Sequence, residues 1–181
     1  MLADLSLHIM DMVQNGIAAN ARNIEIIVCE CTAANSLVFT VADDGCGMTP
    51  AQCARVRDPF MTSRSTRRVG LGVPFLAQAC GQSGGTLSIE SAEGSGTIVR
   101  AAFVRGHIDR PPLGPIADTV RLLFLMHEGI SFVYRQSFNK KEFVIDTCEV
   151  KKRLKREHPG AAMHGQWLKT AICEGIAALY A

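Results

Sequence analysis

The stretch from Val41 to Met48 limits the possible folds of this chain more than any other feature. It reads as the end of a β-strand, then acidic residues, then two glycines separated by one residue. Three more elements accompany it in order: a helix carrying Asp and Asn before it, a Gly-Leu-Gly run at 70–72 and a Gly-Ser-Gly-Thr run at 94–97. Glycine permits close backbone approach and positive φ. In this order the elements predict one ligand site within residues 1–105.

The composition sets the class of protein. The chain has 181 residues, which predicts one domain with a small extension. Its 48% hydrophobic and 20% charged residues are ordinary for a globular protein, and a net charge of +2 gives no reason to invoke nucleic acid or a membrane surface. There is no apolar run of 18 residues, and the first residues lack the basic cluster of a secretory signal. We therefore expect a cytoplasmic protein that binds neither nucleic acid nor membrane.

Seven cysteines are many for this length, and none belongs to a C-x-x-C pair. An odd number in a chain without a signal predicts free, mostly buried thiols. The alternative is a metal or redox role for Cys29 and Cys31, which would share one face of a strand. No second pair of ligands accompanies them in the sequence.

The hydrophobic pattern predicts alternating groups of helices and strands. Thr49, Pro50 and Gln52 have the order of an N-cap, a first-turn proline and a capping-box partner. Gly81 is predicted to end the next helix. The expected helices are 2–20, 50–58, 71–80, 118–128, 149–157 and 163–180, and the expected strands are 24–29, 37–41, 86–91, 97–104, 130–135 and 142–147.

A stretch rich in glycine and proline at residues 106–117 is the best linker candidate. The predicted organisation is therefore a ligand-binding domain over 1–105, this linker, and a small α+β region over 118–181. That last region matches no catalytic motif. Its basic run at 151–156 is interpreted as a solvated helix face, with a partner-docking surface as the alternative.

Two polar patterns indicate metal and phosphate binding. Asp11 and Asn15 are four residues apart, so a helix places both on one face, where their oxygens suit Mg²⁺ and the carboxylate suits a general base. The alternative is an ordinary solvated face. Gly70 and Gly72 precede a helix whose free N–H groups suit a phosphate. No Gly-Lys-Ser/Thr follows, which excludes a Walker A loop.

Asp44 stands where the predicted strand ends and the chain turns. A carboxylate at this point can accept a hydrogen bond from an exocyclic amine, while Gly45 and Gly47 leave room for a flat ring beside it. The alternative is a plain Asp-Gly turn between two secondary-structure elements.

Together these segments resemble the GHKL (Bergerat-fold) ATPase superfamily, and especially its histidine-kinase-like domains. The resemblance implies an α/β fold: a two-layer α/β sandwich of a mixed, largely antiparallel sheet backed by helices, with a small α+β extension after it. ATP would lie between the helices and under a lid. The matching segments are the N box at 11–15, the G1 box at 41–48, the F box and lid start at 58–63, the G2 box at 69–72 and the closing segment at 91–97.

The resemblance implies a role for each matching residue. Asn15 would coordinate the Mg²⁺ between the phosphates, and Asp44 would accept a hydrogen bond from the adenine amino group. Asp11 takes the place of the glutamate base of the gyrase and MutL branch, and its shorter side chain affects hydrolysis more than binding. The other residues expected around the nucleotide are Gly45, Gly47, Met48, Thr62, Gly70, Leu71, Gly72 and Thr97.

Two further features leave alternatives open. Arg64, Arg67 and Arg68 would either touch the triphosphate or form a solvated face of the lid. His8 lies one turn before Asp11 and is interpreted as a polar neighbour rather than a phosphoacceptor.

The predicted function is Mg²⁺-dependent ATP binding by a stand-alone domain of this class, with phosphotransfer to a separate protein partner or slow ATP hydrolysis. The chain would then be a protein kinase or an ATPase. Its partner would be a phosphoacceptor or a regulated factor, and a redox complex is one candidate. The alternative is a non-catalytic ATP/ADP-sensing module, similar to anti-sigma-factor proteins, that binds a protein partner.

Overall fold

The computed structural model of this chain describes residues 4–56, 71–157 and 161–181, without the side chains of 154–157 and 161–164. Helices and strands follow the predicted order, with boundaries that differ by a few residues. The helices are α1 (Leu5–Ala18), α2 (Pro50–Arg55), α3 (Gly72–Gln82), α4 (Ile116–Met126), α5 (Thr147–Glu157) and α6 (Ala161–Tyr180). The strands are β1 (Asn23–Cys31), β2 (Ser36–Asp43), β3 (Thr86–Ser91), β4 (Thr97–Val104), β5 (Ser131–Phe138) and β6 (Lys141–Asp146).

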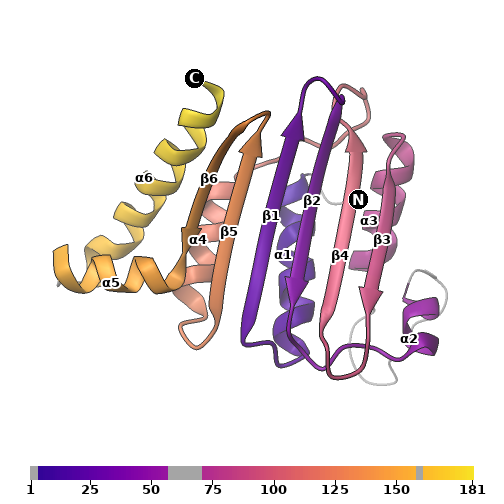
Figure 1. Cartoon of the computed structure of the whole chain (residues 1–181), viewed down its shortest axis with the longest axis horizontal. Helices are drawn as coiled ribbons and strands as arrows, with labels where there is room; N and C mark the ends of the chain where they lie inside the picture. Colours follow the sequence, from indigo (N-terminus) through magenta and orange to yellow (C-terminus); the bar gives the residue numbers. More distant parts are fainter. Residues whose placement is uncertain (1–3, 57–70, 158–160) are drawn as a thin grey trace.

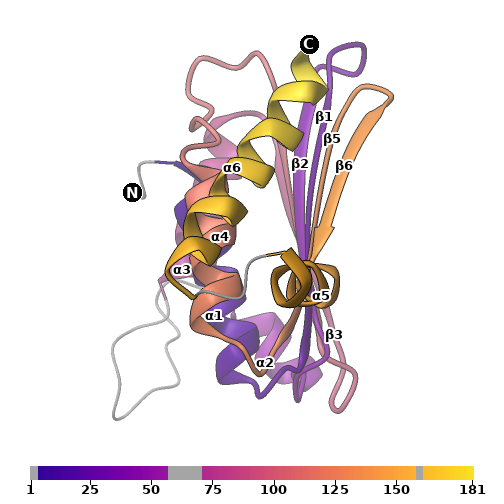
Figure 2. The same ribbon diagram turned by 90° about the vertical axis from the view of Figure 1, so that its left-hand side faces the viewer.

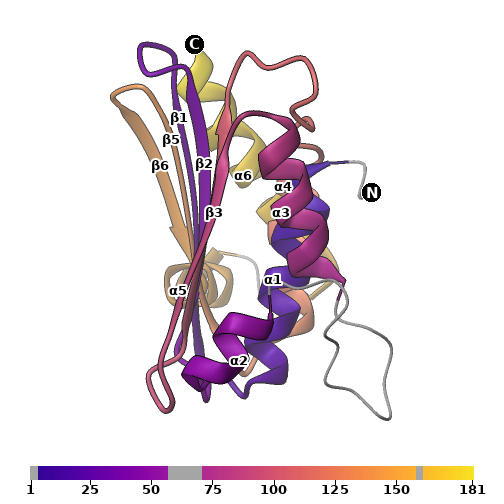
Figure 3. The same ribbon diagram turned by 90° about the vertical axis from the view of Figure 1, so that its right-hand side faces the viewer.

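The fold is a two-layer α/β sandwich, which confirms the predicted class. A six-stranded sheet in the order β3-β4-β2-β1-β5-β6 forms one layer (Figure 1). Helices α1, α3, α4 and α6 form the other layer, all on the same side of the sheet (Figure 2; Figure 3). Every neighbouring pair of strands is antiparallel except β1 and β5, which run parallel. None of the described helices is both long and apolar enough to span a membrane.

The region after the predicted linker continues the same sheet. Strand β5 pairs with β1 along its whole length, so that Ile26 lies beside Tyr134, and β6 then pairs with β5. A parallel pair needs a crossover connection, which α4 supplies. The division into 1–105, 106–117 and 118–181 stays a prediction, and within it the last part is an α+β addition to the sheet edge at β1.

Hydrophobic alternation explains why the helices pack on one face. In β2 the side chains of Leu37, Phe39 and Val41 are buried, while the intervening side chains are partly exposed. In α1 the buried residues Ile9 and Met12 lie three residues apart, on one face of the helix. The inward face of the sheet and the apolar faces of the helices therefore pack together into one core.

The helix boundaries follow their caps, with one correction. The predicted capping box exists: Thr49 Oγ1 accepts from the Gln52 N–H at 3.1 Å, and Gln52 Oε1 accepts from the Thr49 N–H at 2.8 Å. The prediction that Gly81 ends α3 is wrong, because the helix continues to Gln82. The left-handed conformation that ends such a helix belongs to Gly84, with φ 66°.

The last helix is tied to the sheet by a polar network as well as by apolar packing. Leu168 and Ile172, four residues apart on one side of α6, are fully buried. Near its end the Tyr180 hydroxyl donates to Glu30 Oε2 at 2.8 Å, and Glu30 also pairs with Arg105 just after β4. The C-terminal helix is therefore anchored to both β1 and the start of the linker.

The expectation that most cysteines are buried is wrong. Only Cys80 is buried among the free thiols, and burial raises the pKa of this thiol to about 12. Cys29 is exposed because it occupies an outward strand position that no described helix covers. Cys148 and Cys173 lie on exposed positions of helices α5 and α6. The other thiols are exposed at Cys46, Cys148 and Cys173 and intermediate at Cys31 and Cys53.

Two helical glycines give opposite predictions for stability. A Cβ at Gly81 would meet no atom within 4 Å, so Gly81→Ala should raise the free energy of unfolding by about 0.5–1 kcal/mol. A Cβ at Gly175 would lie 2.1 Å from the Phe143 ring, so Gly175→Ala should lower it by roughly 1–3 kcal/mol. Urea unfolding of both variants checks this. If both variants changed the free energy of unfolding equally, the close contact of Gly175 on α6 with Phe143 on β6 would be contradicted.

Candidate functional site

The carboxylate that faces the helices at the end of β2 is Asp43. It continues the inward series of β2, two residues after the buried Val41. Gly16 of α1 lies directly above it, since a Cβ at Gly16 would be 3.0 Å from Asp43 Cβ and 3.2 Å from Oδ2. Asp43 Oδ1 accepts from the Gly45 N–H at 2.9 Å. Burial raises the pKa of Asp43, and the nearby Asp44 charge adds to this, against hydrogen bonding from Gly45 and Thr97.

Asp44 has a different position from the predicted one. Its side chain is exposed, and its Oδ1 accepts from the backbone N–H groups of Arg22 at 2.7 Å and Asn23 at 2.8 Å. Its Oδ2 accepts from the Asn23 side-chain amide at 2.7 Å. These donors hold the pKa of Asp44 below its usual range. The carboxylate thus fixes the α1–β1 turn instead of facing the helices, where the Asp43 carboxylate lies.

Gly47 and Gly96 allow the two loops beside Asp43 to touch. A Cβ at Gly47, where φ is 66°, would lie 1.9 Å from the Ala92 carbonyl oxygen. A Cβ at Gly96, where φ is 80°, would lie 1.9 Å from the Asp43 carbonyl oxygen. No other residue type fits at either point. The glycines of the G1 and closing segments therefore serve backbone contact, which brings the ends of β2, β3 and β4 together.

Ser91 links these segments through its hydroxyl, a role that sequence reasoning did not assign. Its Oγ donates to the Gly96 carbonyl at 2.8 Å and accepts from the Met48 N–H at 2.9 Å. Thr97 Oγ1 lies 2.9 Å from the same Oγ, and because the Ser91 proton is already engaged, Thr97 is the donor. The Thr97 hydroxyl thus keeps its lone pairs for another donor. Thr97 is the cross-strand partner of Asp43, on the same face of the sheet.

Asp11 on α1 faces the beginning of α3. A Cβ at Gly72 would lie 3.0 Å from Asp11 Oδ2, so a larger residue there would require the Asp11 carboxylate to shift. Burial raises the pKa of Asp11. Leu71 is the N-cap of α3, and its side chain caps no N–H group, so within the described part of the chain the N–H groups of this first turn can bind an anion.

Asn15 is exposed one turn further along α1, and its side-chain amide makes no hydrogen bond among the described residues. Within the same part of the chain, no group of three His, Cys, Asp or Glu residues is placed to hold a metal ion. A Mg²⁺ ion that keeps most of its water and is shared with phosphates needs only one such protein oxygen. The oxygens of Asn15 and Asp11 on α1 therefore fit a Mg²⁺ ion whose other ligands are water and phosphate. Thr62, Gly70, the lid start and the arginines at 64, 67 and 68 lie outside the described residues.

His8 is fully buried on α1, and neither of its ring nitrogens has a hydrogen-bond partner among the described residues. Burial lowers the pKa of this histidine, against the nearby Asp4 charge, which raises it. A buried neutral imidazole fits the interpretation of His8 as a neighbour within the core.

The fold is an α/β sandwich of the Bergerat type. This class is defined by the two layers, the strand order and a carboxylate, here Asp43, that faces the helices between glycine loops. The chain belongs to the family of histidine kinase-, DNA gyrase B- and HSP90-like ATPases, whose model matches residues 3–106. The described part of this match comprises α1, β1, β2, α2, α3, β3 and β4. Strands β5 and β6 and the last three helices lie outside it.

Curated relatives are sensor proteins and kinases. The chain is 30% identical over 103 residues to a sensor protein of Shewanella frigidimarina, covering 56% of this chain and 16% of that protein. It is 32% identical over 110 residues to the sensor protein kinase FleS of Pseudomonas aeruginosa, covering 61% and 27%. Sporulation kinase C of Bacillus subtilis is 27% identical over 94 residues, covering 52% and 22%. The chain thus spans a quarter or less of most of these relatives.

Solved structures share the fold. The N-terminal domain of a DNA repair protein superposes with a TM-score of 0.57 at 17% identity, covering 80% of this chain and 52% of that one. The MutL ATPase domain of Aquifex aeolicus, solved with ADP, superposes with a TM-score of 0.52 at 11% identity, covering 86% and 68%. These similarities extend past residue 106 and support the fold alone.

The hydrogen bonds to Asp44 predict a pH-dependent loss of stability in Asp44→Asn. Because the folded state lowers the pKa of Asp44, the stabilisation is present above the unfolded value of about 3.9 and is lost as the pH falls through the folded value. At pH 7 the variant should lose about 0.5 kcal/mol, since solvent screens an exposed carboxylate. Urea unfolding between pH 2 and 7 checks this.

Proposed function

We propose that this chain binds ATP together with Mg²⁺ at the site between α1, the end of β2 and the beginning of α3. The observation that carries the proposal is the Asp43 carboxylate, half-buried beneath Gly16 and beside the free acceptor of Thr97. A fixed carboxylate facing inward accepts a hydrogen bond from the amino group of adenine. Guanine carries a carbonyl at that position, so the two acceptors would repel each other.

The phosphates would lie toward α3. Its uncapped first turn at Gly72 offers N–H groups and the positive end of the helix dipole. Asn15 would supply one oxygen to a Mg²⁺ shared with the phosphates, with water completing the shell. When bound, this ion offsets phosphate charge. Membership of the family and the ADP in the MutL structure support this placement.

The finer proposal is phosphotransfer to a separate protein, or slow ATP hydrolysis, with Asp11 as the base. Its carboxylate lies beside Gly72, and its raised pKa favours accepting a proton at neutral pH. The sensor kinases among the relatives support a protein partner. The alternative is an ATP/ADP-sensing module that binds a partner without chemistry, and the short Asp11 side chain favours it.

Asp43→Asn and Asp44→Asn form a matched pair for the nucleotide site. Asp43→Asn should raise the Kd for ATP about 10- to 100-fold, because the amide turns a donor toward the adenine amino group. Asp44→Asn should leave the Kd within about twofold of the wild type, since its carboxylate faces Arg22 and Asn23.

Isothermal calorimetry with ATP, ADP and GTP, each with and without Mg²⁺, measures these constants. The wild type should bind ATP and ADP but not GTP. In the Asn15→Ala variant, Mg²⁺ should no longer increase the affinity for ATP. Binding that is lost in Asp44→Asn and kept in Asp43→Asn would overturn the assignment of the carboxylate. No binding of any nucleotide would overturn the proposed function.

Asp11→Asn separates chemistry from sensing. Burial disfavours the charged form of Asp11, so removing the charge should raise the melting temperature at pH 7 by about 2 °C. If Asp11 is the base, phosphate release from ATP should fall at least about 100-fold while the Kd changes by less than about threefold. Phosphate release that is equal in the variant and the wild type would contradict the catalytic role and favour the sensing module.

A further inference from the structure

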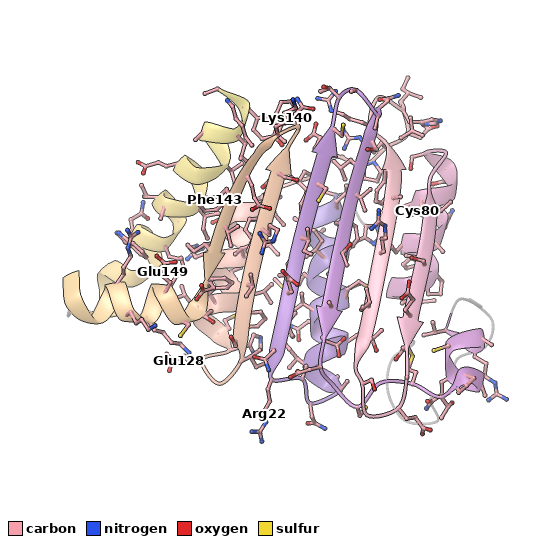
Figure 4. All side chains as sticks on the ribbon, in the orientation of Figure 1. Arg22, Cys80, Glu128, Lys140, Phe143 and Glu149 are labelled. Atoms are coloured by element: carbon pink, nitrogen blue, oxygen red, sulfur yellow. The ribbon has the colours of Figure 1, made fainter. Side chains whose placement is uncertain are left out.

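Three polar side chains lie side by side in one row across the sheet. Ser91 on β3 pairs with Thr97 on β4, and Thr97 pairs with Asp43 on β2, so all three share the face that carries α1. The row lies at the end of the sheet near Arg22 in Figure 4, on the face turned away from the viewer. The next row along the same strands is apolar and consists of Ile89, Val99 and Val41. The polar row therefore borders the apolar core at the proposed nucleotide site.

The Ser91 hydroxyl is saturated by its own hydrogen bonds. Its proton goes to the Gly96 carbonyl at 2.8 Å. Its two lone pairs take the Met48 N–H at 2.9 Å and the Thr97 hydroxyl, whose oxygen lies 2.9 Å away. A serine hydroxyl has one proton and two lone pairs, so Ser91 has no capacity left for a ligand. It can affect a bound nucleotide only through Thr97.

Ser91 decides which way the Thr97 proton points. A free threonine hydroxyl rotates, and it can then either donate or accept. Here the proton is directed to Ser91 Oγ, and no other group in the described part of the chain donates to Thr97 Oγ1, so its lone pairs remain for a ligand. The Thr97 backbone N–H also donates to the Asp43 carboxylate. The hydroxyl and the carboxylate are thus held together as two adjacent acceptors.

We propose that Ser91 is a positioning residue that sets the base specificity of the site, an inference that rests on the proposed binding of ATP beside Asp43. By holding the Thr97 hydroxyl as an acceptor, Ser91 makes the site take a base with an amino group at position 6. The two protons of that group suit Asp43 and Thr97, directly or through one water molecule. A carbonyl at position 6 would meet two acceptors and no proton, because the Thr97 proton is already engaged and the ionised Asp43 has none.

Removing the Ser91 hydroxyl would release the Thr97 proton. In Ser91→Ala the Thr97 hydroxyl loses its acceptor, so it can rotate and donate to a carbonyl at position 6 of a bound base. ITP is the probe for this change. Inosine differs from adenosine only by the carbonyl at position 6 and the proton on the neighbouring ring nitrogen, and it lacks the additional amino group of guanosine. One hydrogen bond gained corresponds to about a 2- to 12-fold gain in affinity.

Competition against a fluorescent ATP analogue, with Mg²⁺ and the full chain, measures the Kd for ATP and the Kd for ITP. The wild type should bind ATP at least about 100-fold more tightly than ITP. In Ser91→Ala the Kd for ITP should fall about 2- to 12-fold, whereas the Kd for ATP should not fall. A loosened loop would raise both constants, so a tighter complex with ITP identifies the released proton.

Thr97→Val gives a second test that leaves Ser91 in place. Valine keeps the branched shape without an oxygen, so the Kd for ATP should rise about 2- to 12-fold, and the Kd for ITP should stay within about twofold. In the double variant Ser91→Ala with Thr97→Val, the gain in ITP affinity should disappear. Ser88→Ala is the matched control, because Ser88 lies on the opposite face of β3, and it should change neither constant.

The wild-type Kd for ATP tests the proposed function, and the Kd values for ITP test Ser91 separately. If the wild type binds ATP but the Kd for ITP does not fall in Ser91→Ala, the role of Ser91 is overturned and the proposed function stands. A gain in ITP affinity that persists in the double variant would overturn that role as well. If the wild type binds neither nucleotide, the proposed function fails and the role of Ser91 fails with it.

Thermal melting shows whether each variant is folded. If Ser91→Ala does not fold, Thr97→Val decides by itself, since it leaves the bonds from Ser91 to Gly96 and Met48 in place. An equal rise of the Kd for ATP and the Kd for ITP in Thr97→Val would mean that the Thr97 hydroxyl donates as readily as it accepts, and would overturn the role of Ser91.

Discussion

The close approach of α1 to the end of β2 is the contact on which the candidate site depends. Because Gly16 has no side chain, the helix can lie directly against Asp43: a Cβ at this position would be only 3.0 Å from Asp43 Cβ. Asp11 and Asn15 belong to the same rigid helix, so this one contact also sets their distance from the sheet. An alanine at Gly16 would press on the Asp43 side chain, so either the carboxylate or the helix would have to shift.

The site opposes the stability of the fold that carries it. Burial raises the pKa of both Asp11 and Asp43, so each charged side chain costs folding free energy at neutral pH. The apolar core formed by the sheet and the helix layer offsets that cost. Asp44 acts in the other direction, because its carboxylate stabilises the turn before β1. Two adjacent aspartates therefore have opposite effects, decided by which way each one faces.

The addition of β5 and β6 changes the family fold at one edge. Strand β5 covers the edge of β1, and α6 is held to the same strand through Tyr180 and Glu30. With these strands in place, β1 and β2 become the middle of the sheet. The region without a catalytic motif thus affects which surfaces the chain presents.

The sequence by itself determined the secondary structure and the segments of the candidate site, because periodicity, caps and glycine spacing are local. The fold class followed from the resemblance of those segments to the GHKL superfamily. It also contained the means to choose Asp43, since Leu37, Phe39, Val41 and Asp43 alternate on one face. Only the tertiary structure decided the parallel pairing of β1 with β5, the link through Ser91 and the exposure of most cysteines. These depend on which elements meet across long stretches of chain and on which face of the sheet stays uncovered, and no local pattern encodes either.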